Sequence, residues 1–287
     1  MDQRFIAHFH HSDPLPNFET TGQLAYIAQI TADDQRYFRC AHVHPEVVEV
    51  SFILTGESTY FIDHQSYPVH AGDIVIVNQQ TVHEEGWLLP SLHVGLQHVQ
   101  TPTLPTGHLI EPTASPIIHT RCFSMLADLA IMAYNLLNRA DDLQMNLANQ
   151  LTTELMLPIL TSLLVPQAGI VQPKKHTESA AAMRIKTFID TEYATIPNLA
   201  FMATQLQMFP SYIDHQFGDN YYRSPSNYLQ SRRIGEAQQA LINLPNRAIT
   251  TIAYDVGFRS LSRFNHVFKN LVGTTPLKFR QAYHQPA

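Results

Sequence analysis

Residues 249–280, which decide the fold, read ITTIAYDVGFRSLSRFNHVFKNLVGTTPLKFR. Apolar residues recur at helical spacing on both sides of Gly257, so the stretch predicts a short helix, a tight turn and a second helix. Gly257 supplies the positive φ that the turn needs, and the small Ala253 lets the two helices approach closely. Thr275 and Pro276 then suit the N-cap and first position of a further helix. The stretch therefore predicts a helix-turn-helix.

A second copy of this pattern lies about 50 residues earlier in the chain. The apolar positions match one to one in the pairs Leu199 and Ile249, Met202 and Ile252, Ala203 and Ala253, Leu206 and Val256, Ile213 and Phe264, and Phe217 and Phe268. One such motif is weak evidence, because an ordinary helical bundle has the same spacing of apolar residues. Two copies in register favour a DNA-binding domain.

Charge divides the chain into two parts. Up to residue 178 there are 7 Lys and Arg against 18 Asp and Glu, a balance of −11, and the remainder has 11 against 6, a balance of +5. A basic domain joined to an acidic one suits nucleic-acid binding at one end. No long apolar run and no secretion signal are apparent, and Cys40 and Cys122 lack metal-type spacing. We therefore expect a cytoplasmic protein with reduced thiols and no membrane partner.

The segments Ile252–Phe258, Phe264–Lys269 and Gly273–Arg280 together resemble the signature of the AraC/XylS transcription regulators. The similarity covers about 100 residues. It implies two helix-turn-helix units joined by a long helix, here Pro225–Leu241, with recognition helices in successive major grooves of double-stranded DNA. It also implies RNA polymerase as a partner and favours activation of transcription over repression.

Mapped onto this chain, the resemblance places the two recognition helices over about 211–219 and 260–270. Asn pairs with adenine and Arg with guanine, and Ser adapts to several bases. The expected DNA-binding residues are Ser211, Tyr212, Asp214, His215, Arg259, Ser260, Leu261, Ser262, Arg263, Asn265, His266 and Lys269.

The first unit departs from the family pattern. Gln207 stands where the family has a turn glycine, and Asp214 and Asp219 lie on the expected recognition helix. Phosphates repel these carboxylates, so this unit binds DNA more weakly or reads cytosine through Asp214. We expect the second unit to supply most of the affinity.

The part before the linker predicts strands and then helices. Short β-branched and aromatic runs separated by turns indicate a sandwich or small barrel, at Ala25–Ile30, Val47–Leu54, Ser58–Ile62 and Ile74–Val77. Apolar residues then take helical spacing over Cys122–Leu137 and Leu143–Leu164, with Pro158 as the expected kink. These helices are the expected homodimer surface, through Leu126, Leu129, Ala133, Leu136, Leu147, Leu151 and Leu155.

The sequence thus predicts an α+β protein of two domains. Residues 1–164 form an effector-binding and dimerisation domain, with a β-barrel over about 20–115 and packed helices over about 120–164. Residues 165–178 are rich in Pro, Gly and polar side chains and form a linker. Residues 179–287 form an all-α domain with the two helix-turn-helix motifs.

The barrel carries a histidine motif. His42-Val-His44, Glu49 and Gly56 have the spacing H-x-H-x4-E-x6-G, and His83 follows. This resembles the first cupin motif with a degenerate second one. Residues two apart on a strand face the same way, so both histidines are expected to point inward, where Glu49 and His83 join them from neighbouring strands.

Three interpretations of this motif remain open. The four residues line a small-molecule site without metal, or they hold Fe, Mn, Ni or Zn for dioxygenase or isomerase chemistry, or they make structural hydrogen bonds. The AraC/XylS resemblance implies an effector-binding barrel, so we expect a sensor with no catalytic residue and no cofactor. The alternatives are a metal-dependent cupin enzyme, with His42, His44, Glu49 and His83 as ligands, and a dimeric regulator that responds to no ligand.

A sugar is the expected effector, and a carbohydrate-utilisation operon the expected target. Sugars need side chains that donate and accept hydrogen bonds, and an aromatic face for stacking. The expected ligand-binding residues are His42, His44, Glu49, His83, His93 and, for stacking, Trp87. The choice of a sugar rests mainly on the family resemblance.

Overall fold

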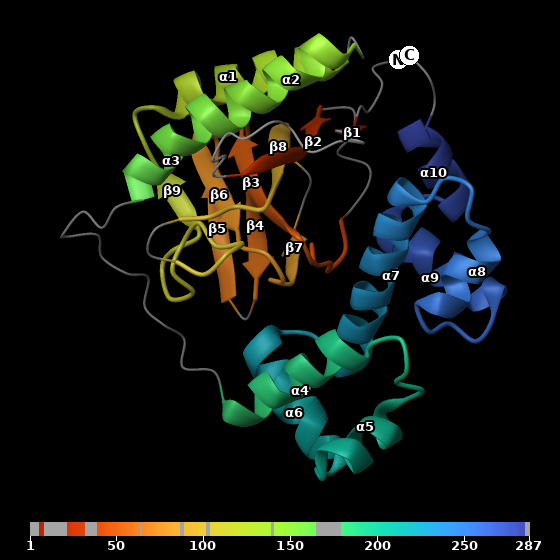
Figure 1. Cartoon of the computed structure of the whole chain (residues 1–287). Coiled ribbons are helices and arrows are strands. Elements are labelled where there is room, and N and C mark those ends of the chain that lie inside the picture. The colour runs from red at the N-terminus through yellow and green to blue at the C-terminus, as the bar shows by residue number, and fades with distance from the viewer. Residues whose placement is uncertain are drawn as a thin grey trace.

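The computed structural model describes residues 6–8, 22–31, 39–63, 65–86, 89–101, 104–138, 141–164 and 179–284. Figure 1 shows two parts, a group of strands covered on one side by helices and a second, wholly helical part. The expected linker and Trp87 lie outside the described residues. In the part of the chain that the structure describes, no helix is both long and apolar enough to cross a membrane.

Two antiparallel sheets form the first part. The strands are β1 (Ile6–His8), β2 (Gln23–Ile30), β3 (Val47–Ile53), β4 (Glu57–Ile62), β5 (Gln65–His70), β6 (Asp73–Val77), β7 (His83–Glu85), β8 (Ser91–Gln97) and β9 (Ile117–His119). One sheet has the order β1-β2-β8-β3-β6-β9 and the other β5-β4-β7. Apolar side chains from both sheets share one core, so the expected small barrel is confirmed.

The central strands β3 and β8 are buried along almost their whole length. One face of their sheet packs on helices, and the other faces the barrel interior. Burial on both faces explains why these strands are nearly continuous apolar runs. The polar residues that interrupt the runs, Glu49, Ser51 and His93, are buried as well. They therefore need partners inside the barrel.

The covering helices are α1 (Phe123–Leu137), α2 (Asp142–Gln150), η2 (Leu151–Met156) and α3 (Leu157–Leu164). The segment η2 is a π-helical stretch directly before Pro158, whose nitrogen cannot donate to the preceding turn. Part of the expected dimer surface is wrong, because Leu126 and Ala133 are fully buried against the sheet. The large apolar side chains that these helices expose are Met125, Met132, Leu143, Leu147 and Leu155.

The second part is α-helical. Its helices are α4 (Ala180–Glu192), α5 (Leu199–Leu206), α6 (Pro210–Tyr221), α7 (Pro225–Asn243), α8 (Ile249–Asp255), α9 (Leu261–Val272) and α10 (Pro276–His284). The pairs α5–α6 and α8–α9 are the two expected helix-turn-helix units, and α7 joins them (Figure 1). Gly257 has φ +91°, as the turn requires, while Gln207 takes φ 56° in the corresponding turn of the first unit.

A short segment of the first part, residues 39–42, packs directly on α7. The backbone N–H of Cys40 donates to Gln238 Oε1 (3.0 Å), and that of Ala41 donates to Ser231 Oγ (3.2 Å). Cys40 joins the apolar core of the second unit, and Ala41 joins that of the first. Both residues are buried, so the segment is wedged between the units along α7.

Gly235 of α7 makes this close approach possible. A Cβ at Gly235 would overlap the backbone carbonyl of Ala41, whereas a Cβ at Gly218, in α6, would meet nothing within 4 Å. Because backbone cannot move aside as a flexible side chain does, a methyl group at Gly235 must push the segment and the helix apart.

We therefore predict opposite effects of two Gly→Ala changes in helices. Gly235→Ala should lower the free energy of unfolding by about 1–3 kcal/mol through overpacking. Gly218→Ala should raise it by about 0.5–1 kcal/mol, because alanine loses less chain entropy in a helix. Chemical denaturation of both variants measures this. Equal behaviour of the two variants would contradict the close contact between Ala41 and α7.

Candidate DNA-binding surface and effector site

The second recognition helix, α9, turns its polar side away from the core. Phe264, Val267 and Phe268 are buried and fix the helix in its unit. The residues expected to contact DNA from this unit are exposed, apart from the half-buried Leu261: Arg259, Ser260, Ser262, Arg263, Asn265, His266 and Lys269. Their exposure leaves this side of α9 free to enter a groove.

Two of these residues also have roles within the helix. Ser260 is the N-cap of α9, where its hydroxyl accepts from the backbone N–H of Arg263 (3.2 Å). His266 Nε2 lies 3.0 Å from Nδ2 of Asn270, one turn further along the helix. The Arg263 guanidinium reaches Gln230 of α7 at 3.5 Å, a weak contact that leaves most of its donors open.

The first recognition helix, α6, has a different surface. Ser211, Tyr212, Asp214 and His215 are exposed on it, and His215 lies 3.3 Å from Asp219. Its sequence contains no Lys or Arg. The N-cap Phe209 is 81% exposed, a feature that the sequence reasoning missed. The first unit thus offers bases an aromatic and acidic surface with little to hold phosphates.

Arg233 of α7 ties the two units to each other. Its guanidinium donates to the backbone carbonyls of Tyr193 (2.7 Å) and Ile196 (2.5 Å), which follow α4. The same group lies over the ring of Phe258 in the second unit, 5.7 Å from its centroid. Burial, followed by the charge of Arg259, lowers the pKa of Arg233 to about 10, so it stays protonated at neutral pH. The relative placement of the units is therefore built into α7.

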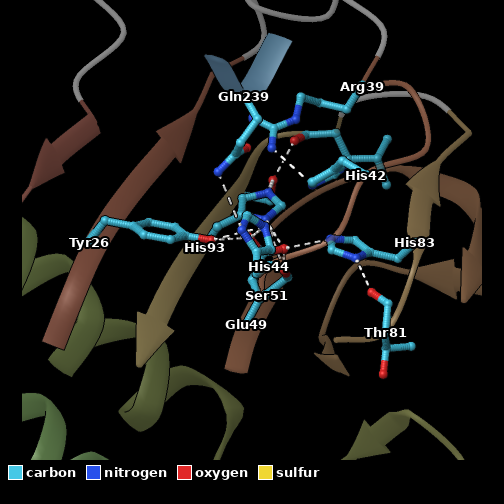
Figure 2. Close-up of polar contacts among 12 residues, drawn as sticks. Tyr26, Arg39, His42, His44, Glu49, Ser51, Thr81, His83, His93 and Gln239 are labelled. Atoms are coloured by element: carbon cyan, nitrogen blue, oxygen red, sulfur yellow. Dashed lines mark hydrogen bonds and ion pairs between the residues drawn. The ribbon is translucent and has the colours of Figure 1, made fainter. Parts of the chain in front are cut away.

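Figure 2 shows the polar cluster inside the barrel. The structure brings together His42, His44, Glu49 and His83, each at most 5% exposed. The imidazole centroids of His42 and His83 lie 4.1 Å apart, and those of His42 and His44 lie 5.0 Å apart. One ligand atom from each of the three histidines falls within a common 4.8 Å. His93 joins this cluster through Glu49.

The strand geometry expected for His42 and His44 is wrong. His42 forms only an isolated bridge, exchanging backbone hydrogen bonds with His83 (3.0 and 2.9 Å), and β3 begins later, at Val47. Pro45 interrupts the segment, since proline has no N–H to give a ladder. The side chains still converge, because α7 holds the backbone of Cys40 and Ala41 and the bridge to β7 holds that of His42.

Glu49 is the centre of the hydrogen bonds. Its carboxylate accepts from the Tyr26 hydroxyl (2.5 Å) and lies 3.2 Å from His93 Nδ1 and 3.4 Å from His44 Nε2. Although burial alone would raise it, the pKa of Glu49 is held well below its usual range by the charge of His93 and by hydrogen bonds from His44 and His93. The same carboxylate raises the pKa of His93 against the effect of burial. Glu49 and His93 thus each favour the charged form of the other.

His42 and His44 are kept neutral instead. Burial lowers the pKa of both, in His42 with a further contribution from the neighbouring His83. His42 Nδ1 lies 2.9 Å from the carbonyl of Cys40, and His83 Nδ1 lies 3.1 Å from that of Thr81. A carbonyl can only accept, so both Nδ1 atoms carry a proton, and in the neutral form of each imidazole Nε2 presents a lone pair to the cluster.

One of these two Nε2 atoms, that of His83, receives no hydrogen bond. His83 Nε2 is buried without a hydrogen-bond partner and lies 3.7 Å from the carboxylate oxygen Oε1 of Glu49. Oε2 of Glu85, two residues further along β7, is buried and unpartnered too. Electron pairs that face each other in a buried site attract a positive species. Imidazoles whose other nitrogen donates to a carbonyl are also the usual form of metal ligands.

Four residues of this cluster were missed by the sequence reasoning. Glu85 could have been found, because it lies two residues after His83 and so on the same face of the strand. Arg39 and Gln239 contact His42 (3.0 Å) and His44 (3.5 Å) respectively, and Tyr26 contacts Glu49. Gln239 comes from α7, and no local pattern links it to the barrel (Figure 2).

Two known domain families match the chain. A helix-turn-helix domain matches residues 202–282, and a cupin domain matches residues 37–87. The first match spans most of both units with α7 between them, and the second contains His42, His44, Glu49 and His83. The fold and both surfaces thus define a protein that combines a DNA-binding domain with a cupin domain.

The relatives are transcription regulators. The chain is 22% identical over 262 residues to the uncharacterized HTH-type transcriptional regulator YdiP of Escherichia coli (strain K12), covering 88% of this chain and 84% of that protein. It is 31% identical over 98 residues to the HTH-type transcriptional regulator ExsA of Pseudomonas aeruginosa, and this alignment covers 34% of this chain and 35% of ExsA. A solved structure of ToxT from Vibrio cholerae O395 has a TM-score of 0.43 and 13% identity, over 87% and 94% of the two chains. The domain pair and the sequence relatives support a DNA-binding transcription regulator of the AraC type.

The two cysteines should differ sharply in reactivity. Burial, followed by the nearby charge of Glu84, raises the pKa of the Cys40 thiol, so little thiolate forms, and its side chain is fully buried on α7. Cys122 is partly exposed. We predict rapid alkylation of Cys122 and slow alkylation of Cys40 in the native protein, with equal rates in denaturant. Peptide mass spectrometry measures both, and rapid native alkylation of Cys40 would contradict the packing of residues 39–42 on α7.

Proposed function

We propose that this regulator changes its binding to promoter DNA when a ligand occupies the polar cluster of its barrel. One observation carries the proposal, namely that the cluster touches the DNA-binding part directly, through Gln239 of α7 at His44. A ligand at His44 therefore lies next to a residue of the helix that joins the two recognition units. The regulator works in the cytoplasm, where its DNA and RNA polymerase are.

A sugar remains the proposed effector, with activation of a carbohydrate-utilisation operon as the outcome. The cluster combines neutral imidazoles, a carboxylate and the Tyr26 hydroxyl, a mixture of donors and acceptors that suits hydroxyl groups. The family resemblance favours activation. A sugar must enter between side chains that now contact each other, so its binding requires the cluster to open.

A divalent metal ion is the second candidate occupant. The unpartnered Nε2 of buried His83 favours it, together with the carbonyl-bound Nδ1 atoms of His42 and His83. His42, His44, His83 and Glu49 would hold the ion, a nitrogen-rich set that suits Fe, Mn, Ni or Zn. The ion would supply a fixed positive charge among these lone pairs.

We also propose a homodimer formed through α1 and the helices that follow it. Met125 and Met132 lie seven residues apart on α1, two turns along one side, and are 45% and 52% exposed. Leu143, in α2, is 70% exposed. Burying such residues against a second copy would remove apolar surface from water and place four helix-turn-helix units on paired half-sites.

Selection from the organism's own DNA tests the function. The purified protein is mixed with genomic fragments, without ligand, with a mixture of simple sugars, and with Zn²⁺, and the retained fragments are sequenced. Retention of a few upstream regions, altered by one ligand class, is the expected result. Retention of no specific fragment at moderate salt would overturn the proposal, whereas specific but ligand-independent retention would leave a regulator without a sensor.

Arg263 tests the docking of α9. We predict that Arg263→Ala weakens binding to the retained fragment by about tenfold or more, because an arginine contact to a base or phosphate is worth about 1–3 kcal/mol. Arg121→Ala removes the same charge from an exposed residue next to α1 and should leave binding nearly unchanged. Fluorescence anisotropy with a labelled fragment measures both affinities. Equal losses in the two variants would show that only net charge matters.

A further inference from the structure

The polar cluster already contains a cation, which is Arg39. Its Nη2 lies 3.0 Å from Nε2 of His42 (Figure 2). Because the proton of His42 is on Nδ1, this Nε2 accepts the hydrogen bond from the guanidinium. Arg39 thus uses a lone pair that a metal ion would need, and it brings a positive charge into the buried site.

The carboxylates of the cluster hold Arg39 in its charged form. Burial alone would lower the pKa of Arg39, but Glu85, followed by Tyr283 and Glu49, more than offsets it, so the pKa is raised. Arg39 therefore partly balances the negative charge of a site that has two buried carboxylates. A divalent ion bound nearby would take over this role and repel the guanidinium.

Arg39 is also the neighbour of the residues that hold α7. Cys40 and Ala41 donate their backbone N–H groups to Gln238 and Ser231, so Arg39, the α7 contacts and His42 lie within four consecutive residues. The hydrogen bond from Arg39 to His42 ties the first residue of this segment to its last, across the two residues that α7 holds. Losing that hydrogen bond removes one of the contacts that keep the segment in place on α7.

A second contact strengthens this connection. Ser231 Oγ accepts from Ala41 and donates to Oε1 of Glu84 (2.8 Å), while the other oxygen of Glu84 pairs with Arg223 (2.7 Å). Glu84 lies on β7 between His83 and Glu85 of the cluster. Residues 39–42 and β7, two of the segments that contribute to the cluster, are thus bound to residues at or next to α7.

We propose that Arg39 is a built-in competitor of a divalent metal ion in this cluster, and that metal binding expels it and loosens residues 39–42 from α7. The proposal rests on the second candidate occupant above and specifies how that ligand regulates DNA binding. Metal and the Arg39 contact exclude each other at Nε2 of His42. Part of the free energy of metal binding is therefore used to weaken the contacts between residues 39–42 and α7, which couples the two sites.

Co²⁺ titration tests the competition, because the visible absorption of the ion reports its ligands. Arg39→Ala should bind Co²⁺ about tenfold more tightly than the unchanged protein, a typical size for coupling between sites. Arg39→Lys keeps a cation and should stay closer to the unchanged protein. Arg121→Ala is the charge-matched control and should not differ. His83→Gln should abolish the absorption bands.

Alkylation of Cys40 tests the release of α7 in the same samples. In the Cys122→Ser protein, where Cys40 is the single thiol, Co²⁺ should speed alkylation of Cys40 about tenfold. In Arg39→Ala, Co²⁺ should still bind, but it should raise the alkylation rate of Cys40 by a smaller factor. The reason is that this variant has already lost the contact with His42. The His83→Gln variant should show no effect of Co²⁺, whether or not its stability is reduced.

Three results would overturn the inference: no Co²⁺ binding, equal Co²⁺ affinity with and without Arg39, or unchanged alkylation of Cys40 in the loaded protein. Retention of genomic fragments is measured on the same preparations without metal. If specific fragments are retained, failure of the Co²⁺ experiments refutes only the role of Arg39. If none is retained, the regulatory function itself fails.

Discussion

The packing of Ala41 against Gly235 is the contact on which the rest of the arrangement depends. Without a side chain at Gly235, the backbone of residues 39–42 reaches α7, where it finds hydrogen-bond partners at Ser231 and Gln238. This contact does two things at once. It holds the helix that joins the two recognition units, and it places His42 and Arg39 in the polar cluster. A larger residue at position 235 would push residues 39–42 away from α7 and so disturb both effects at once.

The two helix-turn-helix units share a plan but differ in chemistry. The second exposes Arg259, Arg263 and Lys269 along or next to α9, which suits phosphates and guanine. The first exposes Tyr212 and Asp214 on a helix without basic residues. Because α7 and Arg233 fix the two units relative to each other, the first can be positioned by the second and need not hold DNA alone. The net positive charge of residues 179–287 comes from the second unit and the residues that flank it.

Much of the fold could be predicted from the sequence, because local patterns determine it. Gly257 and the apolar repeat predicted the helix-turn-helix units, and the spacing of the histidine motif predicted that His42, His44 and Glu49 lie in one cluster. Strand alternation was expected to point His42 and His44 inward, and this reason was wrong. Both residues precede β3, and His42 forms only an isolated bridge. Leu126 and Ala133 were assigned to a dimer surface, because helical spacing shows that a face is apolar but not what covers it. Gln239 could not be predicted, because its contact joins residues 195 positions apart.

The central claim is that one helix, α7, presents two recognition helices to a single face of DNA. Hydroxyl-radical footprinting of the protein on a retained genomic fragment measures this most directly. The account predicts two protected regions for each bound chain, about 10 base pairs apart on the same face, with the stronger protection from the second unit. Protection of a single groove, or of two grooves on opposite faces, would contradict it.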